Sequence, residues 1–146
     1  MSLPSYADPP FACPPDIVLD LPAPISVNRL WRVSKRSVIK SVVYTKWVKT
    51  ADDMLLELGQ LRGVKPIAGK FTALIVVKRS RMDIDNSAKC ILDFLQSRNF
   101  IVNDKLCEEL ILRWGEAPMG CRVTVKPFGC ATMGDVLRRA QEREAV

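Results

Sequence analysis

The chain has 146 residues, of which 48% are hydrophobic and 26% charged, and it contains no histidine. This length suits one domain around a single core, and no apolar run reaches the roughly 18 residues that a membrane span needs. The absence of histidine excludes imidazole-based triads and histidine-ligated zinc, so any catalysis must use carboxylates, lysine or a metal ion.

The formal net charge of +6 is spread unevenly along the sequence. Residues 21–82 carry thirteen Lys or Arg against three acidic residues, whereas residues 83–146 carry nine against ten. Such an asymmetry favours a polyanionic partner such as nucleic acid. A basic surface that serves only solubility explains the charge equally well.

The N-terminal residues and the cysteines both indicate an intracellular protein. The first twenty residues hold five prolines and no Lys or Arg, so they lack the features of a secretory signal, and we expect a cytoplasmic protein. The five cysteines include no Cys-x-x-Cys pair, and their odd number argues against a disulfide framework. We expect reduced thiols, most of them buried as small hydrophobic side chains.

The N-terminal half predicts a lead, a strand, a hairpin and a helix. Residues 1–15 are proline-rich and typical of a flexible lead, and residues 16–21 form a short β-type run before two prolines. Residues 29–43 alternate basic and apolar side chains, as a basic β-hairpin does. Apolar residues at steps of three and four predict a helix over residues 45–62, with a threonine cap and Trp47 on its buried stripe.

The C-terminal half predicts three strands and two helices. Residues 70–78 are typical of a strand buried on both faces, and residues 86–98 of an amphipathic helix. Residues 106–114 and 121–127 alternate with period two and are expected to pair as a hairpin. With a last helix over residues 131–146, we expect a single α+β domain, in which a mixed sheet of about five strands packs with two main helices.

Acidic side chains gather where the strand at residues 70–78 gives way to the next helix. Asp83 and Asp85 alternate along an extended segment, so both can emerge on one face. Lys89 lies one helical turn after Asp85, and Asp104 follows the helix as a possible third carboxylate. Mg²⁺ prefers such oxygen ligands and needs only one or two carboxylates beside water and a substrate phosphate. The pattern therefore predicts a catalytic metal site that uses no histidine.

Each of these residues also has a purely structural explanation. Asp85 or Asn86 suits a helix N-cap, Asp104 suits a turn, and Asp83 can pair with a neighbouring arginine. An isolated Asp-x-Asp-Asn is more often a cap or a turn than a metal site, so the spacing needs support from the rest of the chain.

Basic side chains on both sides of this motif are candidates for contacts to a nucleic-acid backbone. Phosphate contacts of this kind give affinity without sequence information. The candidates come from the expected hairpin and from the segment before the aspartates: Arg29, Arg32, Lys35, Arg36, Lys40, Lys78, Arg79 and Arg81. Trp47 is expected in the core rather than stacked on bases.

Two segments together resemble a known family. The first runs Lys78-Arg-Ser-Arg-Met-Asp-Ile-Asp-Asn-x-x-Lys89 and is followed by Phe100-Ile-Val-Asn-Asp104; the second is Leu21-Pro-x-Pro-x-Ser-x-Asn-Arg29 with Trp31-Arg32. Both closely resemble the RusA family of Holliday-junction resolvases. The resemblance covers roughly residues 17–127, which makes residues 16–130 the expected endonuclease domain, with residues 1–15 and 131–146 as additions.

The resemblance implies a homodimeric, Mg²⁺-dependent endonuclease, with Mn²⁺ as a possible substitute, that binds four-way DNA junctions and makes paired nicks in recombination and repair. It further implies that Asp83, Asp85 and Asp104 form the metal site and that Lys89 is needed for cleavage. Asn103 stands where the family often has another acid. A bacterial or phage origin and a place at the nucleoid are typical of the family.

Two other functions fit the same residues. One is a non-catalytic nucleic-acid-binding protein, in which the aspartates act only as caps. The other is a structure-specific nuclease that acts on flaps, forks or RNA, because junction choice depends on dimer geometry. The number of metal ions, one or two, is open as well.

Overall fold

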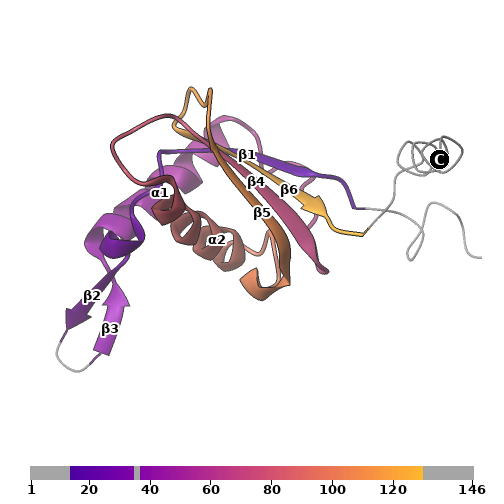
Figure 1. Cartoon of the computed structure of the whole chain (residues 1–146). Coiled ribbons are helices and arrows are strands. Elements are labelled where there is room, and N and C mark those ends of the chain that lie inside the picture. Colours follow the sequence, from indigo (N-terminus) through magenta and orange to yellow (C-terminus); the bar gives the residue numbers. More distant parts are fainter. Residues whose placement is uncertain (1–13, 35–36, 130–146) are drawn as a thin grey trace, which may run out of the picture.

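A four-stranded mixed sheet with two helices forms the body of the protein in the computed structural model (Figure 1). The structure describes residues 14–34 and 37–129, so most of the lead and the C-terminal extension lie outside the described residues. The sheet order is β1 (Ile17–Leu21), β6 (Cys121–Pro127), β4 (Phe71–Val77) and β5 (Cys107–Trp114). The helices are α1 (Val42–Glu57) and α2 (Ala88–Ser97). The expected α+β class is confirmed.

A separate two-stranded sheet extends from this body at the place expected for the basic hairpin (Figure 1). It pairs β2 (Trp31–Ser34) with β3 (Ser37–Lys40), antiparallel. Because these strands form their own sheet, the main sheet has four strands rather than about five.

β5 and β6 do not pair as the expected hairpin. β4 lies between them, parallel to β5 and antiparallel to β6. The reason is burial: alternate side chains of β4 from Phe71 to Val77 are all in the core, which suits a central strand. The connection from Gly115 to Gly120 therefore passes over the end of β4, where Gly115 N donates to Val77 O (3.0 Å) and Lys78 N donates to Gly120 O (2.9 Å).

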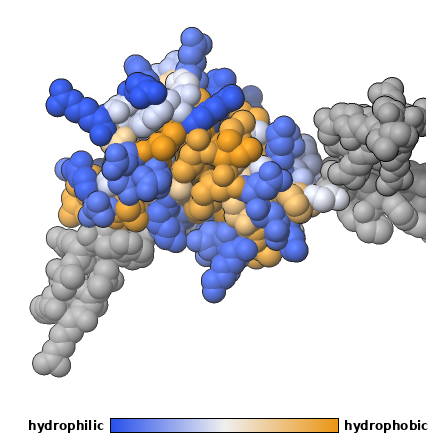
Figure 2. Space-filling model, viewed as in Figure 1, coloured by the Kyte–Doolittle hydropathy of each residue, from blue (hydrophilic) through white to orange (hydrophobic). Residues whose placement is uncertain are grey.

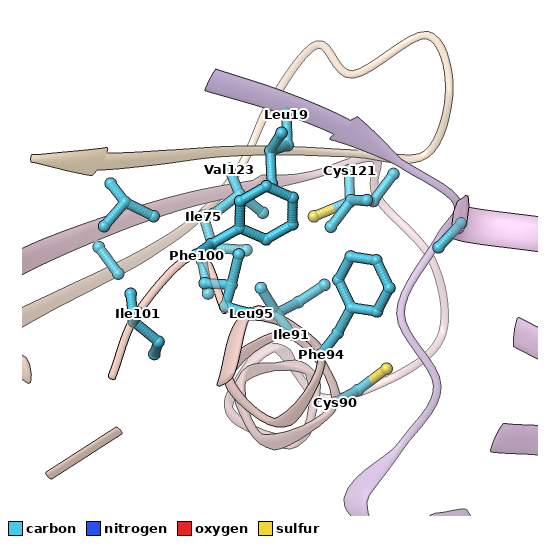
Figure 3. Close-up of a cluster of buried hydrophobic side chains, with 14 of the residues drawn as sticks. Leu19, Ile75, Cys90, Ile91, Phe94, Leu95, Phe100, Ile101, Cys121 and Val123 are labelled. Carbon is cyan, nitrogen blue, oxygen red and sulfur yellow. The ribbon is translucent and has the colours of Figure 1, made fainter. Parts of the chain in front are cut away.

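The core lies between the sheet and the apolar side of α2. Figure 3 shows Phe94 and Leu95 of α2 beside Ile75 and Val123 of the sheet, and all four are fully buried. Trp47 of α1 is only 6% exposed and meets the Phe94 ring edge-on at 5.3 Å. The expectation that Trp47 belongs to the core is confirmed. Each such side chain contributes about 1.5–3 kcal/mol through burial.

α1 begins and ends earlier than the sequence predicted. Its N-cap is Ser41 rather than Thr45, and the Ser41 hydroxyl accepts from Tyr44 N (3.1 Å) and donates to Arg29 O. The sequence pattern did not indicate this start, because two β-branched valines, a residue type that favours strands, occupy the first turn. The helix ends at Glu57 instead of about residue 62, and Gly59 follows with a positive φ of 67°.

The described cysteines Cys90, Cys107 and Cys121 are free thiols, as expected. Cys90 and Cys121 are buried, and burial raises the pKa of the Cys121 thiol to about 12. Cys13 and Cys130 lie outside the described residues. Separately, none of the described helices has the length and apolar character needed to cross a bilayer.

Candidate functional site

The two segments that carry the family resemblance meet in one pocket, which we call the Asp83 pocket. One wall comes from residues 23–26 and Arg29, and the other from residues 80–83 and Asn86. Its volume is about 480 Å³. The short helices of the two segments, η1 (Val27–Arg29) and η2 (Ile84–Ser87), are in contact, so residues far apart in sequence share this surface.

Asp83 and Asp85 are held at the entry to α2 with their carboxylates facing solvent. Asp83 is the N-cap of η2, but its side chain makes no capping hydrogen bond. Both residues are exposed, and neither side chain has a hydrogen bond or an ion pair with another described residue. The chain then turns into α2 through Ser87, whose hydroxyl donates to Ile84 O (2.6 Å). Neither Asp85 nor Asn86 is therefore the helix cap that the sequence suggested.

The pairing of Asp83 with a neighbouring arginine is also absent among the described residues. Arg79 instead lies over the ring of Trp114, with its Cζ 5.2 Å from the ring centroid. Arg81 lines the same pocket as Asp83 without an ion pair to it. These carboxylates thus have no structural partner in the part of the chain that the structure describes.

Lys89 and Asp104 lie in direct contact, in a second pocket between α1 and α2 that we call the Lys89 pocket. The Lys89 Nζ is 3.1 Å from Asp104 Oδ2 and 3.0 Å from Asp93 Oδ1. Asp104 N in turn donates to Gln96 Oε1 (3.0 Å). The pocket measures about 710 Å³ and is lined by Tyr44, Thr45, Val48, Lys89, Asp93, Gln96, Ser97, Arg98 and Asp104.

The charges of this second pocket keep Lys89 protonated. The hydrogen bond to Asp93 raises the pKa of Lys89; partial burial opposes this shift and the contact with Asp104 adds to it. Burial raises the pKa of the neighbouring Tyr44 phenol to about 12. At neutral pH the pocket therefore presents an ammonium group and an uncharged phenol.

The turn that carries Asp104 is capped by its neighbour. Asn103 is the N-cap of η3 (Asp104–Leu106), and its Oδ1 accepts from Lys105 N (2.9 Å). The local turn role therefore belongs to Asn103, which leaves the Asp104 carboxylate to contact Lys89. An aspartate at position 103 could cap the turn in the same way.

The structure brings together Lys89 and Asp104, and places Asp83 in the other pocket. Within residues 14–34 and 37–129, no three or more His, Cys, Asp or Glu side chains are grouped so that they could hold a metal ion. The three-aspartate metal site stays a prediction. Asp83 and Asp85 supply the oxygen donors that Mg²⁺ prefers, and that ion needs only one or two carboxylates because water and phosphate complete its shell.

The predicted basic residues fall into three groups. Arg29 and Arg81 line the Asp83 pocket. Lys78 and Arg79 are exposed beyond the end of β4, and Lys78 borders a small pocket with residues 115–118. Of the hairpin residues, Arg32 and Lys40 lie on β2 and β3, and Lys35 and Arg36 lie outside the described residues.

Sequence reasoning missed Asp93 and Gln96. Both lie on the side of α2 that also carries Lys89, at steps of four and seven residues, and both contact the Lys89–Asp104 pair. The spacing of Lys89 and Asp93 was a visible signal, because a Lys and an Asp four residues apart on a helix are neighbours.

No family model matches the chain, and no curated protein matches it. The function must therefore be inferred from the residues and their geometry.

Proposed function

We propose that this chain is a Mg²⁺-dependent endonuclease, with Mn²⁺ as a substitute ion, that cuts four-way DNA junctions by paired nicks. The observation that carries the proposal is the Asp83 pocket. It combines an exposed carboxylate, which has no partner among the residues that the structure describes, with two arginines, Arg29 and Arg81. A phosphodiester held beside a divalent cation needs this combination.

The residues of the two pockets have different roles in the proposed reaction. Asp83 and Asp85 would hold the ion, which on binding supplies a more acidic water as the nucleophile. Arg29 and Arg81 would hold the phosphate, because a guanidinium matches its oxygens in two-pronged geometry. Lys89 would offset the charge that develops on the scissile group, and Asp93 and Asp104 fix the position of its ammonium.

The junction as substrate is supported by the resemblance to RusA-type resolvases and by the basic character of residues 21–82. Two symmetric nicks need two identical sites, and a homodimer supplies them. Such an enzyme works in the cytoplasm on nucleoid or phage DNA.

The test is a nicking assay on a four-way junction, a simple duplex and a flap, each with Mg²⁺ and with EDTA. We expect paired nicks in opposing strands of the junction only when Mg²⁺ is present. Asp83→Asn and Asp85→Asn should abolish cleavage and spare junction binding measured in EDTA. Asp53→Asn, which changes an exposed aspartate of α1, is the matched control and should cut normally.

Each other outcome of this assay indicates a different function. Binding without any cleavage indicates a non-catalytic binding protein, and a preference for the flap indicates another structure-specific nuclease. Cleavage that persists in EDTA, or at the wild-type rate in Asp83→Asn, would remove the metal site from the proposal.

A further inference from the structure

β5 is an edge strand, and no described strand pairs with its outer side. It ends the sheet order β1-β6-β4-β5, and Leu110 and Ile111 are 41% and 46% exposed. Figure 2 shows an apolar patch on the face of the molecule where Figure 1 places β5 and α2. An apolar edge strand with unpaired backbone groups is a template for another strand, and proteins normally protect such edges.

Both ends of β5 differ from its middle part. At the start, the register with β4 shifts between Phe71 and Thr72, whose partners are Cys107 and Glu109, so Glu108 forms a bulge. At the other end, Arg79 covers the ring of Trp114. The open part of the strand therefore runs from Glu109 to Arg113.

This open segment, Glu-Leu-Ile-Leu-Arg, is complementary to itself. If two copies pair antiparallel around a two-fold axis at Ile111, each Glu109 lies opposite Arg113 of the second copy. Leu110 then meets Leu112, and Ile111 meets Ile111. The register with β4 places Glu109, Ile111 and Arg113 on one face of the sheet and Leu110 and Leu112 on the other. In this pairing, the two side chains of every cross-strand pair therefore lie on the same face of the joined sheet.

We propose that a second copy of this chain docks along residues 109–113, so that the two main sheets join edge to edge through β5. The charge pattern selects this partner, because a two-fold operation brings each acid to a base. The proposal rests on the edge strand and not on nuclease chemistry, so either can fail alone. If both hold, the dimer provides the two sites that paired nicks need.

The other edge strand lacks this complementarity. In β1, a two-fold axis at Leu19 would place the apolar Val18 opposite the acidic Asp20 of the second copy. Asp20 is also already engaged by Arg122, whose Nε is 2.9 Å from Asp20 Oδ1. Val18 is 47% exposed, about the same as Ile111 at 46%, and therefore offers a matched control.

The test is the mass of the full chain without DNA, measured by sedimentation and light scattering over a range of concentrations. We expect a dimer that Ile111→Lys converts to a monomer and that Val18→Lys leaves unchanged. Circular dichroism and thermal unfolding of both variants establish that the monomer is folded.

A charge exchange tests the register. Glu109→Arg alone and Arg113→Glu alone should each raise the dimer dissociation constant by about tenfold or more, because two cross-strand ion pairs become two repulsions. The double variant Glu109→Arg with Arg113→Glu should restore the dimer. A wild-type monomer at all concentrations, a folded Ile111→Lys dimer, or a double variant as weak as the single ones would overturn the proposal.

Discussion

Lys89→Met would remove the ammonium that separates two carboxylates. Asp93 and Asp104 are each about 3 Å from the Lys89 Nζ, so their contacting oxygens are no more than about 6 Å apart. At an effective dielectric constant of about 20, two like charges at that distance repel by roughly 3 kcal/mol. Their side chains are 16% and 27% exposed, and screening by solvent lowers the repulsion to about 1–2 kcal/mol.

We therefore expect Lys89→Met to lower the free energy of unfolding by about 1–2 kcal/mol, measured as a shift of the urea midpoint. The control is Lys70→Met, which changes another lysine with a carboxylate partner. Its Nζ is 3.4 Å from Glu108 Oε1 and its side chain is 62% exposed, so the loss should stay below about 1 kcal/mol. Adding Asp93→Asn to Lys89→Met should recover part of the lost stability, because it removes the repulsion.

The same variant tests the catalytic role. Below its unfolding transition, Lys89→Met should reduce kcat on a junction by roughly 10²–10³-fold, the usual cost of losing a charge-stabilising donor, with little change in KM. Cleavage at the wild-type rate would refute the catalytic assignment. A normal urea midpoint, together with no recovery on adding Asp93→Asn, would refute the electrostatic reasoning.

Three further predictions concern the fold and the DNA surface. Burial raises the pKa of Asp20, but hydrogen bonds from Arg122 and Gln60 outweigh it and lower the pKa below 3.8. The stability that these hydrogen bonds contribute is present above about pH 4 and is lost as pH falls through the lowered pKa. Asp20→Asn should therefore lower the free energy of unfolding by about 1–2 kcal/mol at pH 7. It should also flatten the acid side of a plot of stability against pH. A Cβ at Gly120 (φ 122°) would overlap the backbone of Ala23, so Gly120→Ala should lower the melting temperature by several degrees, ~4 °C or more per kcal/mol lost. Arg81→Gln should weaken junction binding and reduce its log–log salt dependence by about one; an unchanged slope would separate Arg81 from the phosphate contacts.

The strands could be predicted from the sequence because their periodicity reports burial directly. β4, β5 and β6 lie within one residue of the expected ranges. Their pairing could not be predicted, since alternation identifies a strand but not its neighbour. β5 and β6 are adjacent in sequence, and only the greater burial of β4 places that strand between them.

The site shows the same division between local and long-range information. The position of Asp83 and Asp85 just before α2 is local information, because it follows from their place in the sequence. The contact of Asp104 with Gln96 depends on where the chain after α2 returns, because Asn103 caps the turn and directs Asp104 toward the helix. Nor did the sequence pattern reveal that Arg29 and Asp83 line one pocket, since β2, β3 and α1 intervene between them.

The contact between Lys89 and Asp104 bears directly on whether Asp104 is a metal ligand. An ammonium 3.1 Å from Asp104 Oδ2 competes with any cation for that oxygen. If Asp104 takes part in the metal site, removing the ammonium should tighten binding of Mn²⁺ by at least about 1 kcal/mol, roughly fivefold in the dissociation constant.

Calorimetric titration of Mn²⁺ into Lys89→Met measures this change in affinity without any need for cleavage. Lys70→Met is again the control, because its partner Glu108 lies outside both pockets. Tighter binding in Lys89→Met alone would place Asp104 in the metal site beside Asp83 and Asp85. Equal binding in both variants would make Asp104 a positioning residue for Lys89 and leave two carboxylates to hold the ion, which is within the range that Mg²⁺ sites use.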